Sequence, residues 1–104
     1  MSAPRLSPST LKTLRGMIID RDEAWRADAE MAPVIEEAIR NGLQNVDGKT
    51  HDRIYMYLRY GPRGEDGQCQ PLPGSYETYG LDEKQMAKAW RKYLKRHGLQ
   101  PVVA

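Results

Sequence analysis

Apolar side chains recur at helical spacing in three segments of the chain, and the clearest segment is residues 82–97. At about 100° per residue, Met86, Trp90, Tyr93 and Leu94 fall on one side of a helix. Lysine and arginine occupy the opposite side. The pattern predicts an amphipathic helix with one face on a core and a cationic face directed elsewhere.

Both ends of this helix are specified by neighbouring residues. Asp82 is a favourable N-cap, and Gln85 stands three residues later, which is the spacing of a capping box. Gly98 followed by Leu99 is typical of a Schellman ending, and Pro101 prevents the helix from continuing. The predicted boundaries therefore rest on local hydrogen bonding as well as on periodicity.

The other two helical segments are residues 8–30 and 33–41. Each has a proline at an early position, and Ser7 precedes Pro8 as a capping hydroxyl. In the second segment the apolar stripe runs to a stop at Asn41-Gly42-Leu43, which resembles the glycine ending of the third helix.

One carboxylate interrupts the apolar stripe of residues 8–30. Asp22 falls among positions that should face the core. Either the helix bends near Asp20, or a basic partner holds Asp22, because a buried carboxylate needs compensation. One helix with an irregularity is the preferred interpretation.

Residues 53–60 fit two periods. At period two, Ile54, Met56 and Leu58 alternate with tyrosine and arginine, and this β-branched and aromatic composition favours a strand. At period 3.6, Ile54 and Leu58 share a short helical stripe. The strand is slightly preferred, so residues 50–79 are expected to form either a β-hairpin or a short helix followed by a long loop.

Composition agrees with a mainly α, small single-domain protein of about three helices. The chain has 104 residues, 39% of them hydrophobic, and no Phe, so the core should be small and a homodimer would supplement it. We expect a flexible arm over residues 1–6 and one helical domain over residues 7–104. No apolar run reaches the length of a membrane span. A single cysteine, Cys69, and the absence of a secretory signal favour the cytoplasm.

The charges are segregated along the chain, although the net charge is only +2. Residues 82–98 carry six cations and two acids, a balance of +4. Residues 20–37 carry seven acids and two arginines, a balance of −5. These two segments could meet each other, within one chain or across a dimer, and a functional interpretation of the cations depends on their remaining free.

If the cations are free, a row of lysine and arginine at one-turn spacing can follow the backbone of a polyanion, since each neutralised phosphate releases counterions. The leading hypothesis is a non-catalytic regulatory or accessory protein that binds nucleic acid through the third helix. The proposed nucleic-acid-binding residues are Lys84, Lys88, Arg91, Lys92, Lys95 and Arg96.

Such binding should be largely independent of sequence. Recognition helices read base edges with Asn, Gln, Ser or Thr, and only Gln85 on this helix qualifies. A standard helix-turn-helix also needs a turn of three or four residues between its helices, and the nearest preceding candidate ends about twenty residues before Asp82.

The alternative hypothesis is a protein-interaction module, such as an inhibitor or adaptor. If residues 53–60 form a strand, Tyr55, Tyr57 and Arg59 point to the same side, and exposed tyrosine with arginine is typical of interface hot spots. These tyrosines could instead replace the missing phenylalanines in the core.

No catalytic, metal or cofactor site is expected. His51, His97 and Cys69 lie far apart and have no metal-ligand spacing. The glycines of residues 61–67 match neither a P-loop nor a dinucleotide fingerprint, and two acids among them would repel phosphate. The chain is therefore expected not to be an enzyme.

Overall fold

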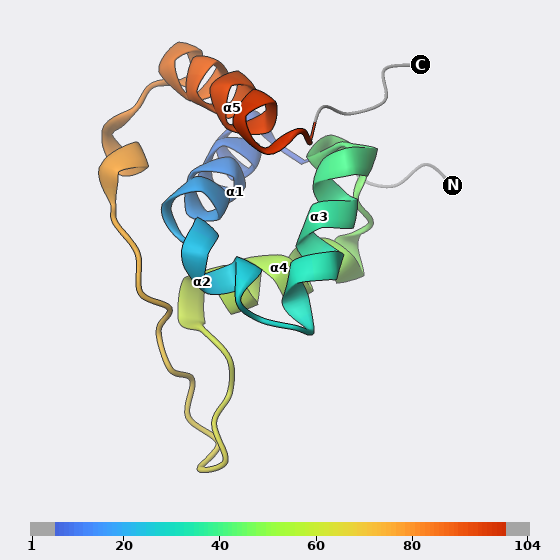
Figure 1. Cartoon of the computed structure of the whole chain (residues 1–104), viewed down its shortest axis with the longest axis vertical. Helices are drawn as coiled ribbons and strands as arrows, with labels where there is room; N and C mark the ends of the chain where they lie inside the picture. The colour runs from blue at the N-terminus through green and yellow to red at the C-terminus, as the bar shows by residue number, and fades with distance from the viewer. Residues whose placement is uncertain (1–5, 100–104) are drawn as a thin grey trace.

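The structure is a computed structural model that describes residues 6–99. This range contains five α-helices and two short 3-10 helices and no strand, which confirms the mainly α fold class (Figure 1). The elements are α1 (Pro8–Asp20), α2 (Asp22–Arg26), α3 (Met31–Asn41), η1 (Leu43–Asn45), α4 (Gly48–Tyr60), η2 (Glu77–Gly80) and α5 (Glu83–His97). The expected arm lies outside the described residues except for Leu6, which packs partly buried against the core.

The predicted caps of α1 and α5 are confirmed. Ser7 Oγ accepts a hydrogen bond from the Thr10 amide at 3.2 Å, and Asp82 and Gln85 form both halves of the capping box. At the end of α5, Gly98 is left-handed, and the Leu99 amide donates to the Leu94 carbonyl at 2.9 Å, as in a Schellman ending. The role of Pro101 falls outside the described residues.

The segment predicted as one helix over residues 8–30 forms two helices. α1 ends at Asp20 and α2 begins at Asp22, with the intervening Arg21 at φ −111° and ψ 22°. The bend and the basic partner, posed as alternatives, both occur, because Arg26 forms an ion pair with Asp22 at 2.6 Å. The chain turns at this point so that the Trp25 side chain enters the core.

The preferred strand over residues 53–60 is wrong, and the helical alternative is correct. α4 is capped by Asp47, whose carboxylate accepts from the Thr50 amide at 2.7 Å. Ile54, Tyr57 and Leu58 are buried, at the spacing of one helical face. Burial of that face outweighs the weak strand preference of its residue types.

The core surrounds α1, which contacts α4, η2 and α5. α5 lies along one side of α1, and α2, α3 and α4 lie on the other (Figure 1). Both tryptophans are buried, and the Trp25 indole N–H donates to the Ile18 carbonyl at 2.9 Å. The core therefore relies on Trp, Ile, Leu and Met in place of phenylalanine.

A long loop joins α4 to η2 and extends to the end of the molecule opposite α5 (Figure 1). Its sole bridge in residues 61–76 pairs Arg63 with Cys69, so the expected β-hairpin is reduced to one antiparallel contact. Gly61 begins the loop at φ +83°, where a Cβ would lie 1.6 Å from the Gln70 carbonyl oxygen. Only glycine fits this close approach of the two loop arms.

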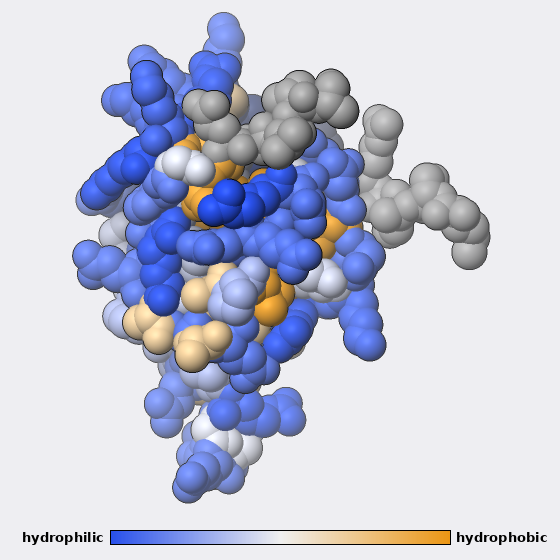
Figure 2. All heavy atoms as spheres, turned by 45° about the vertical axis from the view of Figure 1, so that its right-hand side comes forward, coloured by the Kyte–Doolittle hydropathy of each residue, from blue (hydrophilic) through white to orange (hydrophobic). Residues whose placement is uncertain are grey.

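None of the helices in residues 6–99 is long and apolar enough to cross a membrane. The face of the molecule drawn in Figure 2 is mostly hydrophilic, and apolar atoms appear on it only in small, separate areas.

Gly16 permits the close contact between α1 and η2, and its replacement by alanine should destabilise the fold. A Cβ at Gly16 would lie 2.7 Å from Thr78 Oγ1. That hydroxyl already donates a hydrogen bond to Asp20 Oδ2 at 2.5 Å, so it is held in place. We expect Gly16→Ala to lower the free energy of unfolding by about 1–2 kcal/mol in urea denaturation, because overpacking outweighs the better helix propensity. Gly48→Ala is the matched control, since nothing lies within 4 Å of its Cβ position and its stability should be unchanged or higher. Equal stability of the two variants would contradict this account of the contact.

Candidate nucleic-acid interface

The six predicted nucleic-acid-binding cations lie on the outer side of α5, and all are exposed. The other side of the helix faces the core and carries the buried residues Met86, Trp90 and Tyr93. We call the exposed set the basic face: Lys84, Lys88, Arg91, Lys92, Lys95 and Arg96. Within this helix, Lys88 lies opposite the middle of the buried side, so it stands at the centre of the face.

The Gln85 side chain, the one base-reading candidate on α5, already has a structural role. Its amide oxygen accepts from the Asp82 backbone N–H at 2.9 Å as part of the capping box. Bidentate recognition of a base needs both ends of the amide. The geometry therefore agrees with contact that does not depend on base sequence.

Several carboxylates of residues 20–37 are paired with groups outside the basic face. The central case is Asp22, whose Oδ1 accepts from Arg26 Nε at 2.6 Å and from the Tyr93 hydroxyl. Arg26 also donates to Glu36 at 2.9 Å and to the Tyr93 oxygen at 3.1 Å, and His97 Nε2 lies 3.7 Å from Asp22 Oδ2. We call these five residues the Asp22 network.

The Asp22 network joins α5 to α2 and α3. Burial raises the pKa of the Tyr93 phenol above its usual value, and the adjacent Asp22 carboxylate adds to the shift, so the hydroxyl keeps its proton and donates it. The Arg26 guanidinium lies over the Trp25 ring, with 4.5 Å between its central carbon and the ring centroid. The network thus fixes the inner side of α5 through residues distinct from those of the basic face.

Three further acids of this segment are also engaged. Asp20 accepts from Thr78, and the Asp28 carboxylate accepts from the amide of Met31, the first residue of α3, at 3.0 Å. Glu30 pairs with Arg53 of α4 at 2.8 Å.

Over residues 6–99, no ion pair within 4 Å joins a carboxylate of residues 20–37 to the basic face. Arg96 lines a hollow of about 510 Å³ together with Asp20, Asp22 and Glu23. The other five cations of the basic face do not line this hollow.

Two cations of α1 lie beside α5 and were not predicted as site residues. Lys12 and Arg15 line a hollow with Glu83 and Met86 of α5. The Arg15 guanidinium lies 5.6 Å from the Trp90 ring, and burial lowers its pKa. The sequence shows that both residues flank the apolar stripe of α1. It does not show that α1 packs against α5, so their position beside the basic face could not be predicted.

The three residues predicted for partner binding do not share a face. Tyr57 is 7% exposed, so the expectation that it points outward is wrong, because α4 turns it into the core. Tyr55 is partly buried and Arg59 is exposed. Arg59 donates to the Tyr55 hydroxyl at 3.3 Å and to the Tyr60 hydroxyl at 3.2 Å.

Over the described part of the chain, no group of three or more His, Cys, Asp or Glu side chains is placed to hold a metal ion. His51 and Asp52 lie together on α4, whereas Cys69 is exposed in the loop and His97 belongs to the Asp22 network.

No protein-family model, curated protein or solved structure matches this chain.

Proposed function

We propose that this protein binds nucleic acid through the basic face of α5, with little dependence on base sequence. One observation carries the proposal: all six cations are exposed, while five of the seven carboxylates of residues 20–37 bond to Arg26, Arg53, hydroxyl groups or backbone amides. A cationic surface that is not neutralised by its own fold attracts polyanions.

The mechanism is electrostatic and follows from helix geometry. Four cations form a row along the helix, at steps of three or four residues: Lys84, Lys88, Arg91 and Lys95. This row advances by about 5 Å along the helix axis per turn. Such a row can contact successive phosphates and release their condensed counterions. Specific recognition of bases is not expected, because the amide oxygen of Gln85 is committed to the capping box.

The salt dependence of binding tests this proposal. With about four phosphate contacts, log Kobs for a 20-base-pair duplex should fall with log salt at a slope of about −3 to −4, so affinity drops roughly a hundredfold between ~50 and ~200 mM salt. Fluorescence anisotropy with two labelled duplexes of unrelated sequence measures it. Equal affinities for the two are expected, and no anisotropy change at ~50 mM salt rules the proposal out.

A second candidate is the protein-interaction module, favoured by exposed apolar surface on α4. Met56 and Tyr60 are 53% and 45% exposed, and Arg59 lies between them in sequence. Affinity capture with and without nuclease separates the two functions. Nucleic-acid binding predicts that captured material is lost after nuclease treatment, whereas a direct protein partner would be retained.

A further inference from the structure

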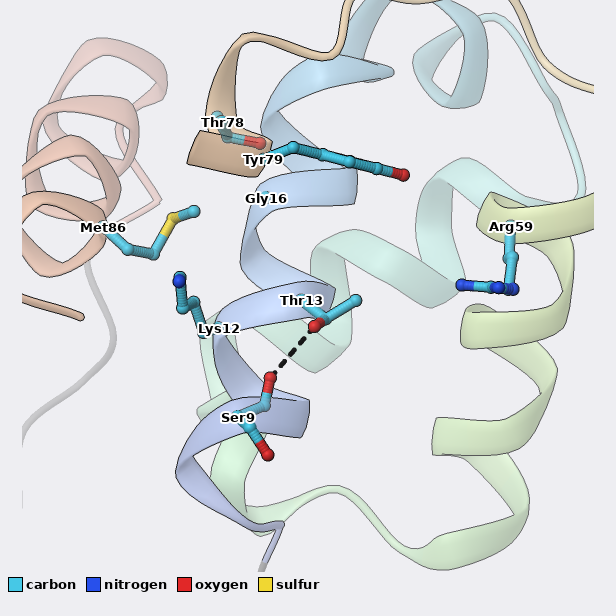
Figure 3. A pocket seen from close by; sticks show the side chains of 8 residues that line it. All are labelled: Ser9, Lys12, Thr13, Gly16, Arg59, Thr78, Tyr79 and Met86. Carbon is cyan, nitrogen blue, oxygen red and sulfur yellow. Dashed lines mark hydrogen bonds between the residues drawn. The ribbon is translucent and has the colours of Figure 1, made fainter. Parts of the chain in front are cut away.

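A hollow of about 330 Å³ lies between α1, α4, η2 and the start of α5. Figure 3 shows Tyr79 of η2 lying across α1 with its hydroxyl toward Arg59 of α4, and Lys12 reaching up from α1 toward Met86 of α5. Ser9 and Thr13 add hydroxyl groups along the α1 wall.

The chemistry of this hollow is cationic and aromatic. No Asp or Glu is among its lining residues in the part of the chain that the structure describes, whereas Lys12 and Arg59 both line it. Two neighbouring hollows along α1 share walls with it, and each contains an acid, Asp52 in one and Glu83 in the other. The central hollow is therefore the one suited to an anionic group.

Arg59 is held in place for such a group. Its Nε and Nη1 atoms donate to the Tyr60 and Tyr55 hydroxyls, which leaves Nη2 outside these two bonds. Its guanidinium carbon also lies 5.5 Å and 5.9 Å from the Tyr60 and Tyr55 ring centroids. An arginine positioned by its neighbours loses less side-chain entropy when it binds a phosphate.

Tyr79 supplies a ring against which a planar group can stack. It is 56% exposed, and its partner Tyr76 meets it edge-on, with 5.1 Å between the ring centroids. The exposed fraction of Tyr79 leaves part of its ring accessible to such a group. Bases stack on such rings whatever their sequence, because every base has a π-face.

We infer that this hollow holds one unstacked nucleotide of a single strand, with its base on the Tyr79 ring and its phosphate on Arg59. The inference rests on the proposed function and extends it. It predicts a preference for single strands, because the bases of a duplex are stacked on each other and paired. Met86 lines the hollow from the side of α5 opposite the basic face, so the hollow and the basic face contact different parts of a bound strand.

Tyr79→Ala tests the inference by anisotropy at ~50 mM salt with labelled 20-nucleotide oligothymidylate and a 20-base-pair duplex. We expect the wild-type protein to bind the single strand more tightly than the duplex. Tyr79→Ala should weaken single-strand binding roughly tenfold, the usual effect of removing one stacking ring, and leave duplex binding unchanged. Tyr79→Phe is the matched control, since it keeps the ring and should keep the affinity. Because Tyr79 is exposed, both variants should melt like the wild type.

The outcomes separate the inference from the proposed function. If Tyr79→Ala binds the single strand as well as the wild type does, or if the duplex binds as tightly as the single strand, the inference fails and the function stands. If neither nucleic acid binds the wild type, the proposed function fails. Thymidine monophosphate should not displace the strand at ~1 mM, and displacement at micromolar concentration would assign the hollow to free nucleotides instead.

Discussion

Reversing two charges at the centre of the basic face, Lys88→Glu with Lys95→Glu, should abolish binding to duplex DNA. At ~50 mM salt we expect Kd to rise by about a hundredfold or more in fluorescence anisotropy. Each reversal removes a phosphate contact and adds a repulsion, so two reversals cancel the contribution of about four contacts. Both side chains are exposed and make no ion pair within residues 6–99, so thermal stability should change little.

A second double variant distinguishes the basic face from net charge. Lys49→Glu with Arg63→Glu changes the formal charge of the chain by the same amount, at exposed positions on α4 and in the long loop. The loop lies at the end of the molecule opposite α5 (Figure 1). We expect this control to retain binding within about fivefold, the residual effect of long-range charge. An equal loss in both double variants would mean that α5 has no special role.

Asp22→Ala should produce the largest loss of stability. It leaves the Arg26 guanidinium and the Tyr93 hydroxyl without their common acceptor. Breaking a fully buried pair costs about 3–5 kcal/mol. The Asp22 and Arg26 side chains are 21% and 27% exposed, so we expect a loss of about 2–3 kcal/mol and a melting temperature lower by roughly 10–20 °C.

Glu23→Ala is the matched control for Asp22→Ala. It removes the same charge from the first turn of α2, but Glu23 is exposed. Its cost should stay below about 1 kcal/mol, the usual contribution of an acid near a helix N-terminus. Calorimetric melting of both variants measures the difference, and similar melting temperatures would show that the Asp22 network adds no stability of its own.

The sequence predicted the start of α1 and both ends of α5 well because their determinants are local. The capping box of Asp82 and Gln85 and the αL turn at Gly98 span only a few residues, and any fold that keeps the helix keeps them. The irregularity near Asp20 was also detected, since a carboxylate in an apolar stripe conflicts with burial. The break between α1 and α2 at Arg21 could not be predicted, because it depends on how Trp25 packs into the core. The pattern of apolar positions along the sequence does not give that packing.

Residues 53–60 were misjudged because their residue types and their packing favour different structures. Tyrosine and isoleucine suit a strand, and the alternation of apolar positions supported that interpretation. Which period applies depends on the surface available for burial, and α4 buries Ile54, Tyr57 and Leu58 together. The Asp47 side chain caps this helix, and this local signal was not recognised in the sequence.

The candidate site could be predicted only in part. The exposure of the basic face follows from the apolar face opposite it, so it was predictable from periodicity. The partners of the acidic segment were not, because the bonds from Tyr93 to Asp22 and Arg26 join residues about seventy positions apart. The placement of Tyr79 near Arg59 likewise depends on how the long loop returns to α1.

The segregation of charge has a kinetic consequence. Cations on the outside of α5, with carboxylates gathered on α2 and α3, give the molecule an electric dipole moment even though its net charge is only +2. In the field of a polyanion, such a molecule rotates to present α5 before contact. Productive encounters are then more frequent than random collision allows, and this steering weakens as dissolved ions shorten the reach of the field.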